Sequence, residues 1–202
     1  MKTLFKLLTA FFLMSMGLIG CDDDEKLPEN YIQIQGKTYE LAGGVIINVG
    51  QDEWHKGFNT DLAFFSKGLT VDDKMELTGE GEIVYFEMFS TQGDVLNNAQ
   101  YAYSQEEPYE IGTISSGEYY YYIEDSEEED VIHEITSGIV SVTVIGDKYT
   151  ITINCEGSDK EKITGQYIGK LQIMDYSAYE DDENDEYAKQ QSIKKIKRNT
   201  KN

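Results

Sequence analysis

The stretch GIVSVTVIGDKYTITINC, residues Gly138 to Cys155, contains two runs of alternating apolar and polar residues joined by Gly146-Asp147. Glycine at the first position of a two-residue loop favours a tight β-turn, so the two runs are predicted to form a hairpin. Closing this turn places Val142 opposite Ile151, with the apolar side chains on one face and the threonines on the other. The predicted inward residues are Val140, Val142, Val144, Tyr149, Ile151 and Ile153. The sequence therefore specifies the register of this hairpin.

The same count puts Cys155 opposite Gly138, on the apolar face of the hairpin. A nucleophilic cysteine needs a nearby base and access to solvent, and the sequence suggests neither. We therefore predict that the Cys155 thiol is buried and unreactive.

Alternation broken by Gly, Asn and Asp continues from Tyr31 to about Tyr176, with no long stretch of helical period. The 202 residues fit one ordinary domain. We expect an all-β fold, a single antiparallel β-sandwich or barrel of about nine strands. The candidate strands are Tyr31–Leu41, Val45–Val49, Asp61–Ser66, Ile83–Ser90, Gln100–Ser104, Glu118–Ile123, Gly138–Ile145, Lys148–Cys155 and Lys162–Met174.

Two of these strands carry further information. The segment from Ile83 to Phe89 is apolar on both faces, which predicts a place in the middle of a sheet. In the last strand, Gly165 and Gly169 share a face with four apolar residues, as expected where a strand bends or a large neighbour passes close by. The four are Ile163, Tyr167, Leu171 and Ile173.

The chain begins like an export signal. A short cationic start, Met1 to Lys6, precedes the apolar run Leu7 to Leu18, which is too short for a transmembrane helix. The following residues, Leu18-Ile-Gly-Cys21, resemble the lipobox of bacterial lipoproteins. This resemblance implies cleavage before Cys21, acylation of its thiol and attachment to a membrane. The alternative is an ordinary signal peptide followed by a cysteine by chance.

An acidic run, Asp22 to Glu25, follows the cysteine directly. It resembles the surface-export signal of small β-rich lipoproteins from Bacteroidetes-type bacteria, which implies display on the outer face of the outer membrane. In other Gram-negative groups an aspartate at this place implies retention at the inner membrane instead. The predicted organisation is a signal peptide over 1–20, an acidic tether over 21–30, a β domain over 31–178 and a charged, disordered tail over 179–202.

The chain has 38 acidic against 17 basic residues and a net charge of −21. So strong an acidic excess repels phosphate backbones, which excludes nucleic acid as a partner of the body. Two cysteines and two histidines are too few for a zinc module or a disulfide framework. The acid runs could collect Ca²⁺, but Asp181 to Glu186 lacks the spacing of an EF-hand. We expect neither a metal nor a cofactor.

No catalytic motif is present in the sequence. It contains no GxSxG, HExxH, P-loop or dinucleotide fingerprint. Carboxylates are numerous enough for glycoside hydrolysis to stay open, but no residue pattern favours it. We therefore expect a protein that is not an enzyme and has no catalytic residues.

Two aromatic features are candidate binding surfaces. The loop from Gln51 to Phe58 holds the only tryptophan, Trp54, and a ligand site of Trp54, His55 and Phe58 would combine stacking with hydrogen bonds. The alternative is that Trp54 and Phe58 fold back and plug one end of the fold. The run Tyr119 to Tyr122 presents two rings to each face of a strand, so one pair is exposed unless both faces are covered.

These observations leave two functions from different classes. The first is a lipid-anchored, non-enzymatic binding protein at the cell surface, with a glycan or a host or other protein as ligand. The second is a structural or assembly subunit of a surface complex or fimbria, in which an edge strand is covered by other subunits.

Overall fold

The structure is a computed structural model that describes residues 26–51, 53–72, 76–124, 126 and 131–177. The described residues form eleven β-strands, and none lies in a helix long and apolar enough to cross a membrane. The strands are β1 (Tyr31–Ile34), β2 (Lys37–Gly50), β3 (Phe58–Ser66), β4 (Leu69–Val71), β5 (Leu77–Ser90), β6 (Ala99–Tyr103), β7 (Thr113–Ile123), β8 (His133–Ile145), β9 (Lys148–Gly157), β10 (Lys162–Gly169) and β11 (Gln172–Asp175). The predicted signal peptide, Cys21 and the charged tail lie outside the described residues.

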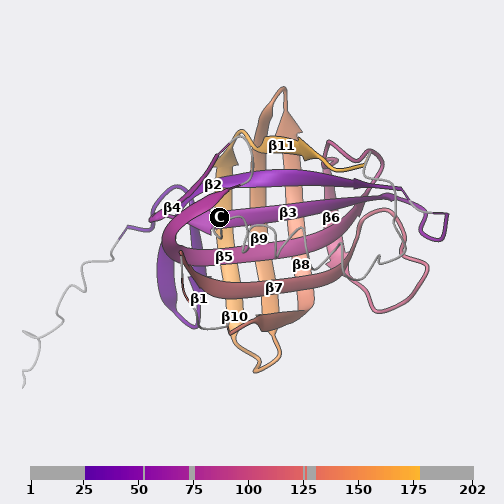
Figure 1. Cartoon of the computed structure of the whole chain (residues 1–202). Helices are drawn as coiled ribbons and strands as arrows, with labels where there is room; N and C mark the ends of the chain where they lie inside the picture. The colour runs from indigo at the N-terminus through magenta and orange to yellow at the C-terminus, as the bar shows by residue number, and fades with distance from the viewer. Residues whose placement is uncertain (1–25, 52, 73–75, 125, 127–130, 178–202) are drawn as a thin grey trace, which may run out of the picture.

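Nine of these strands close into a barrel (Figure 1). Hydrogen bonding follows the order β1-β10-β9-β8-β6-β7-β5-β3-β2, and β2 pairs again with β1. Outside the ring, β4 pairs with β5, and β11 pairs with β2. The prediction of a single all-β domain is confirmed, and of the two architectures the barrel is the one formed. Because a closed ring has no free edge strands, its backbone groups are paired within the sheet.

The register predicted for the central hairpin is confirmed. Strands β8 and β9 pair Ile145 with Lys148 and Val142 with Ile151. The inward residues of both strands belong to the large hydrophobic cluster inside the barrel, which we call the main core. By contrast, Thr143 and Thr150 are exposed. Thus the period of two in the sequence decides which face of this hairpin is buried.

Cys155 lies opposite Gly138, as predicted, and is only 3% exposed. Burial raises the pKa of its thiol to about 11. A group whose pKa lies so far above neutrality stays protonated, and a protonated thiol is a poor nucleophile.

The predicted first strand, Tyr31–Leu41, is wrong because the structure divides it into β1 and β2. The turn between them is Gln35-Gly36, with φ angles of 52° and 80°. Two successive left-handed residues make a turn that suits a two-residue hairpin. Conversely, β2 does not end before Val45: it continues through a bulge between Leu41 and Gly43.

The predicted last strand is also wrong. Strand β10 ends at Gly169, and the chain then turns so that β11 runs parallel to β2, pairing Ile173 with Ile46. As a result Ile173 is 52% exposed instead of facing the core. Five other strands begin earlier than the alternation indicated, namely β3, β5, β6, β7 and β8, and β4 was not predicted at all.

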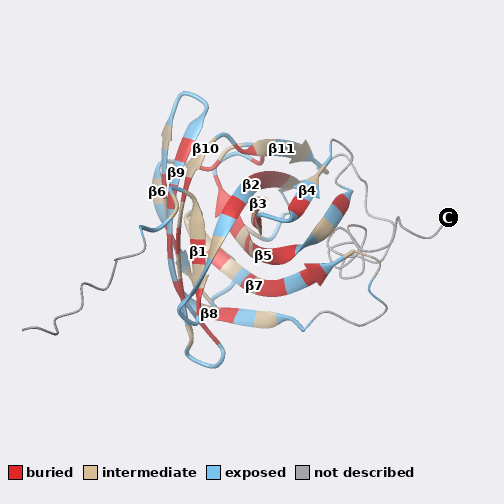
Figure 2. Ribbon diagram, turned by 90° about the vertical axis from the view of Figure 1, so that its left-hand side faces the viewer, coloured by how far each residue is buried: buried red, intermediate tan, exposed pale blue. Residues whose placement is uncertain are grey.

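The prediction about the central strand is confirmed, because β5 lies between β3 and β7. Figure 2 shows that β5 is buried along most of its length. One face of β5 points into the barrel, and on its other face Leu77 and Ile83 belong to a second apolar cluster together with Leu69 of β4. This outer cluster comprises Leu69, Leu77, Ile83, Tyr120 and Tyr122.

The glycines on the inner face mark close approaches, as predicted. A Cβ added at Gly165 would lie 2.7 Å from the Tyr31 carbonyl oxygen and 2.8 Å from the Ile32 side chain. At Gly169 it would lie 2.9 Å from the Tyr167 hydroxyl. These approaches let bulky neighbours fill the interior of a narrow barrel.

The two ends of the barrel differ. At one end the loop between β5 and β6 inserts Leu96, which is completely buried in the main core. Tyr101 fixes this loop, since its hydroxyl accepts a hydrogen bond from the Asn97 N–H at 2.8 Å and donates one to Ser90 Oγ at 3.4 Å. At the other end, where β1 turns into β2, the interior is lined by polar and aromatic side chains.

Candidate binding site at the open end of the barrel

A pocket of about 490 Å³ lies at the open end of the barrel. Its lining includes Lys37, Tyr39, Glu82, Tyr119, Tyr121 and His133. We call this site the mouth. The residues come from four strands, β2, β5, β7 and β8, that are far apart in the sequence.

Strand alternation explains why these side chains point inwards. Leu41 and Val84 belong to the main core, and Tyr39 and Glu82 lie two residues before them on the same faces. On β7, Tyr119 is part of the core, so Tyr121 follows it on the inner face and lies opposite Glu82. The inner face of these strands thus becomes polar only at the last inward-facing positions before the end of the barrel.

Tyr39, Lys37 and Glu82 form the first group in the mouth. The Lys37 ammonium lies over the Tyr39 ring, 4.5 Å from its centroid, which is the geometry of a cation–π contact. Burial raises the pKa of the Tyr39 hydroxyl; the hydrogen bond with Lys37 lowers it, and that with Glu82 raises it. The phenol therefore stays neutral beside the Lys37 ammonium and the Glu82 carboxyl group.

Tyr119, His133 and Glu161 form the second group. The rings of Tyr119 and His133 stack with centroids 4.7 Å apart and planes 9° apart. The Tyr119 hydroxyl donates to Glu161 Oε1 at 2.8 Å. Burial and then this hydrogen bond raise the pKa of Tyr119. The phenol is thus held as a neutral donor in one orientation.

Glu82 is the buried carboxyl group of the mouth. Glu82 is only 8% exposed, and its backbone N–H donates to Ser66 Oγ at 2.8 Å. By contrast, Tyr121 on the neighbouring strand is exposed at the rim. The mouth therefore combines buried hydrogen-bonding groups with an accessible aromatic ring, a combination that suits reversible binding.

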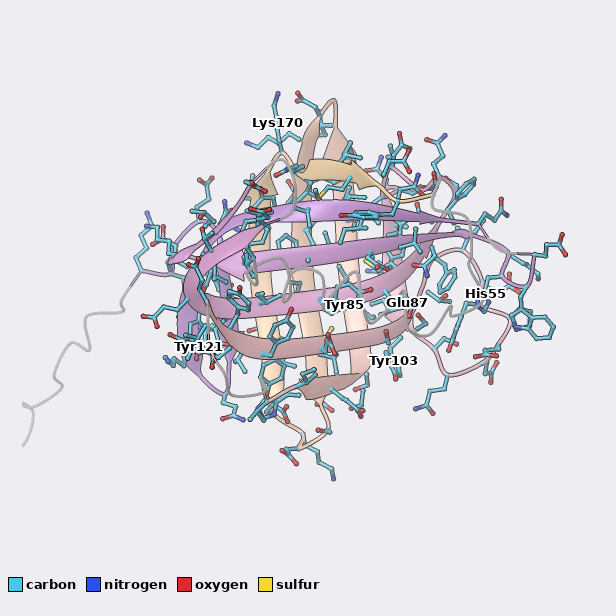
Figure 3. The ribbon with its side chains drawn as sticks, viewed as in Figure 1. His55, Tyr85, Glu87, Tyr103, Tyr121 and Lys170 are labelled. Atoms are coloured by element: carbon cyan, nitrogen blue, oxygen red, sulfur yellow. The ribbon has the colours of Figure 1, made fainter. Side chains whose placement is uncertain are left out.

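The residues predicted as a ligand site lie away from the mouth. In Figure 3 His55 and Tyr121 are on opposite sides of the molecule. The His55 ring packs against Phe89 and Tyr109, with centroids 4.8 Å and 4.9 Å away. His55 Nδ1 also accepts the Tyr109 N–H at 3.1 Å. The imidazole therefore anchors the loop that contains Tyr109.

The other two predicted residues differ in exposure. Trp54 is 64% exposed, so the alternative that it folds back as a plug is wrong. Leu96 closes that end of the barrel instead. Phe58 is partly buried and begins β3 opposite Ser90. Whether these residues contact a ligand stays a prediction.

The run of four tyrosines is almost entirely structural. Tyr119 faces the core, and Tyr120 and Tyr122 lie in the outer cluster under β4, where the Tyr122 hydroxyl donates to the Leu77 carbonyl at 3.2 Å. Only Tyr121 is exposed. The sequence indicated this run, but it gave no signal for Tyr39 or Glu82, because their meeting depends on barrel closure.

Among the described residues, no three His, Cys, Asp or Glu side chains are placed to hold a metal ion. Over the part of the chain that the structure describes, the fold and the mouth define a small closed β-barrel with one end plugged by Leu96 and the mouth at the other end. Comparison of the chain with protein-family models, curated proteins and solved structures finds no match.

Proposed function

We propose that this chain is a non-enzymatic binding protein that holds a small, hydroxyl-rich ligand, such as the end of a glycan, in the mouth of its barrel. The observation that carries the proposal is the convergence of Tyr39, Glu82 and Tyr121 on one pocket of about 490 Å³. Aromatic rings stack on the apolar faces of sugars, and carboxyl and phenol groups hydrogen-bond to their hydroxyls. The net charge of −21 disfavours anionic ligands.

The binding prediction uses the fragment that starts at Leu27, which contains the whole barrel. Tyr121→Ala is expected to reduce affinity for a glycan found on an array by at least about tenfold, because it removes an exposed stacking ring. Its melting temperature is expected to stay close to that of the parent. Titration calorimetry measures the affinity.

Trp54→Ala is the matched control, since it removes an exposed aromatic residue at the far end of the barrel. Loss of binding in Trp54→Ala but not in Tyr121→Ala would move the site to the Trp54 loop. If neither variant affects binding, the proposal for both sites is wrong.

We also propose that the binding domain is a lipoprotein, anchored through Cys21 and displayed outside the outer membrane. The support is the sequence Leu18-Ile-Gly-Cys21 and the acidic run that follows it. Metabolic labelling with an alkyne fatty acid is expected to mark the wild-type chain and to miss Cys21→Ser completely. A labelled Cys21→Ser chain would refute the anchor, and protease treatment of intact cells tests the outward orientation.

The accessory-subunit function is the second candidate. Trp54 and Ile111 are both exposed, and a Cβ added at Gly57, in the Trp54 loop, would lie 3.2 Å from the Ile111 side chain. An exposed aromatic residue near an exposed aliphatic one suits a protein contact. Closure of the barrel removes the long edge strands that strand addition would use. A subunit that docks here would be lost from pull-downs with Trp54→Ala and retained with Tyr121→Ala.

A further inference from the structure

A second polar surface lies on the outside of the barrel, over β3, β5 and β7. Val84, Phe86 and Met88 point into the core, so Tyr85 and Glu87, which alternate with them along β5, point outwards (Figure 3). Cross-strand pairing places Asp61 beside Glu87, and Tyr85 beside Glu118. Three carboxyl groups therefore share one outer face, which we call the acidic face.

The acidic face is substantially removed from water. Asp61 is only 6% exposed and Asn59 only 7%. Glu87 accepts hydrogen bonds from Asn59 Nδ2 at 2.8 Å and from Ser116 Oγ at 3.1 Å. Burial, followed by the negative charge of Asp61, raises the pKa of Tyr85 well above its ordinary value. Carboxylates gathered in such surroundings create a strong negative potential.

One buried acceptor in this face has no partner. Asn59 uses its Nδ2 on Glu87, and its Oδ1 is buried without a hydrogen bond. A buried acceptor left unsatisfied costs about 1 to 3 kcal/mol, so an N–H donor brought to this place is favoured. The same kind of occupant, a cation with several N–H donors, would therefore satisfy both Asn59 Oδ1 and the carboxyl groups.

An apolar cluster adjoins the acidic face on its β2 side. Ile47 pairs with Asp61, and Val45 pairs with Ala63. Val45 and Ile47 are buried there, and Met174 and Tyr176, which are only partly buried, pack against them and provide the accessible apolar surface of this cluster. A matching occupant would therefore carry aliphatic side chains next to its positive charges.

The chain itself contains such a segment. Residues Ile193-Lys-Lys-Ile-Lys-Arg198 combine four positive charges with two isoleucines. The last described strand, β11, runs beside β2, and the Tyr176 N–H donates to the Asn48 carbonyl at 2.8 Å. Asn48 is next to Ile47, the partner of Asp61. The described chain therefore ends beside β2, the strand next to β3 of the acidic face.

Chain length permits a return to this face. The acidic face extends across β3, β5 and β7, and neighbouring strands are about 4.8 Å apart. Residues 178–192 can span on the order of 50 Å when extended, at about 3.3 Å per residue.

We propose that residues Ile193–Arg198 dock on the acidic face of the same chain, with their basic side chains on Asp61, Glu87 and Glu118 and their isoleucines against the adjoining apolar cluster. The occupant carries the complementary charge and the required aliphatic groups, and it is tethered beside its site. Tethering raises its effective concentration, so a weak intrinsic affinity suffices.

A spin label at Ser192→Cys tests the docking in the chain from Leu27 to Asn202. At low salt, amide signals around Asp61, Glu87 and Glu118 are expected to lose most of their NMR intensity, while signals around Tyr121 keep theirs. At 1 M salt, where the screening length is about 3 Å, most of that loss should disappear. Strong broadening spread evenly over the barrel, or none, would overturn the proposal.

Charge variants separate docking from general attraction. The pair Lys194→Glu and Lys197→Glu is expected to abolish the local intensity loss without touching the barrel. On the barrel, Glu87→Gln with Glu118→Gln should weaken it, whereas the matched pair Glu106→Gln with Glu107→Gln, at two exposed positions, should not. If the two pairs of barrel substitutions weaken the intensity loss equally, the segment is attracted by the net charge of the barrel and not by the acidic face.

The same label identifies a different occupant. A mixture of isotope-labelled chain without the spin label and spin-labelled chain without isotope shows any broadening between molecules. Broadening found in this mixture would assign the face to a second copy and overturn docking within one chain. If the intensity loss is present without anionic lipid vesicles and disappears when they are added, the segment docks on the face and the vesicles compete for it. If the segment binds vesicles but no intensity loss occurs without them, the docking proposal is wrong.

Discussion

Val142→Asp is expected to destabilise the barrel by at least about 4 kcal/mol, a large part of the 5 to 15 kcal/mol that holds a typical domain together. Val142 is buried in the main core, where it lies between Ile151 on β9 and Ala99 on β6. The substitution replaces apolar contacts with a carboxyl group that has no partner in this interior. Most of the cost is the desolvation of that group, or its forced protonation.

Thr143→Asp is the matched control, because residue 143 is the next on the same strand and its side chain is exposed. We expect a change within about 0.5 kcal/mol. Urea denaturation measures both variants. Similar losses at residues 142 and 143 would contradict the assignment of the inner face.

Cys155 provides a second readout of the same experiment. It is the only cysteine in a fragment that begins at Leu27, and burial raises its pKa to about 11 in the folded protein. In the unfolded chain an ordinary thiol pKa of about 8.5 returns, so a thiol reagent at pH 8 reacts mainly with opened molecules. Labelling should be much faster in Val142→Asp than in Thr143→Asp.

Gly138→Ala is expected to cost about 3 to 5 kcal/mol, from backbone strain and steric overlap together. Gly138 has φ = 132°, which L-residues rarely adopt. A Cβ at this position would lie 2.4 Å from the Cys155 Cα and 2.5 Å from the Asn154 carbonyl oxygen. Both are backbone atoms of β9, so the overlap can be relieved only by separating the two strands.

Gly146→Ala is the control that measures the cost of backbone strain without steric overlap. Gly146 also has a positive φ, 65°, but a Cβ there meets no atom within 4 Å. Its cost should be only about 1 kcal/mol, the usual penalty of a left-handed residue. Thermal denaturation of the two variants gives the comparison. A Gly138→Ala protein as stable as Gly146→Ala would show that β8 and β9 are not so close at this point.

The sequence predicted best where the information is local. The hairpin of β8 and β9 has a two-residue turn and uninterrupted alternation, so its register and the burial of Cys155 follow from counting. The turn at Gln35-Gly36 was missed because glutamine is a weaker turn signal than asparagine or aspartate. The break expected before Val45 is absent, because Gly43 and Gly44 allow Phe65 and Phe64 to pack closely against a continuous strand.

The candidate site was less predictable than the fold. The sequence singled out Trp54 and His55 because they are the polar and aromatic residues of one loop, and it noted Tyr121 as part of a tyrosine run. The structure places Tyr121 with Tyr39 and Glu82, which are 82 and 39 residues away from it in the sequence. Local patterns contain no information about which distant strands become neighbours.

The sequence by itself therefore determined the all-β class and, for the hairpin of β8 and β9, both the inward face and the register, because side chains alternate across a strand with a period of two. Only the tertiary structure decided that the sheet closes into a barrel, that Leu96 plugs one end and that Tyr39, Glu82 and Tyr121 meet at the other. The physical reason is that closure depends on pairing between distant strands, such as β1 with β10 and β5 with β7. That pairing is fixed by the packing of the whole interior and not by any local pattern.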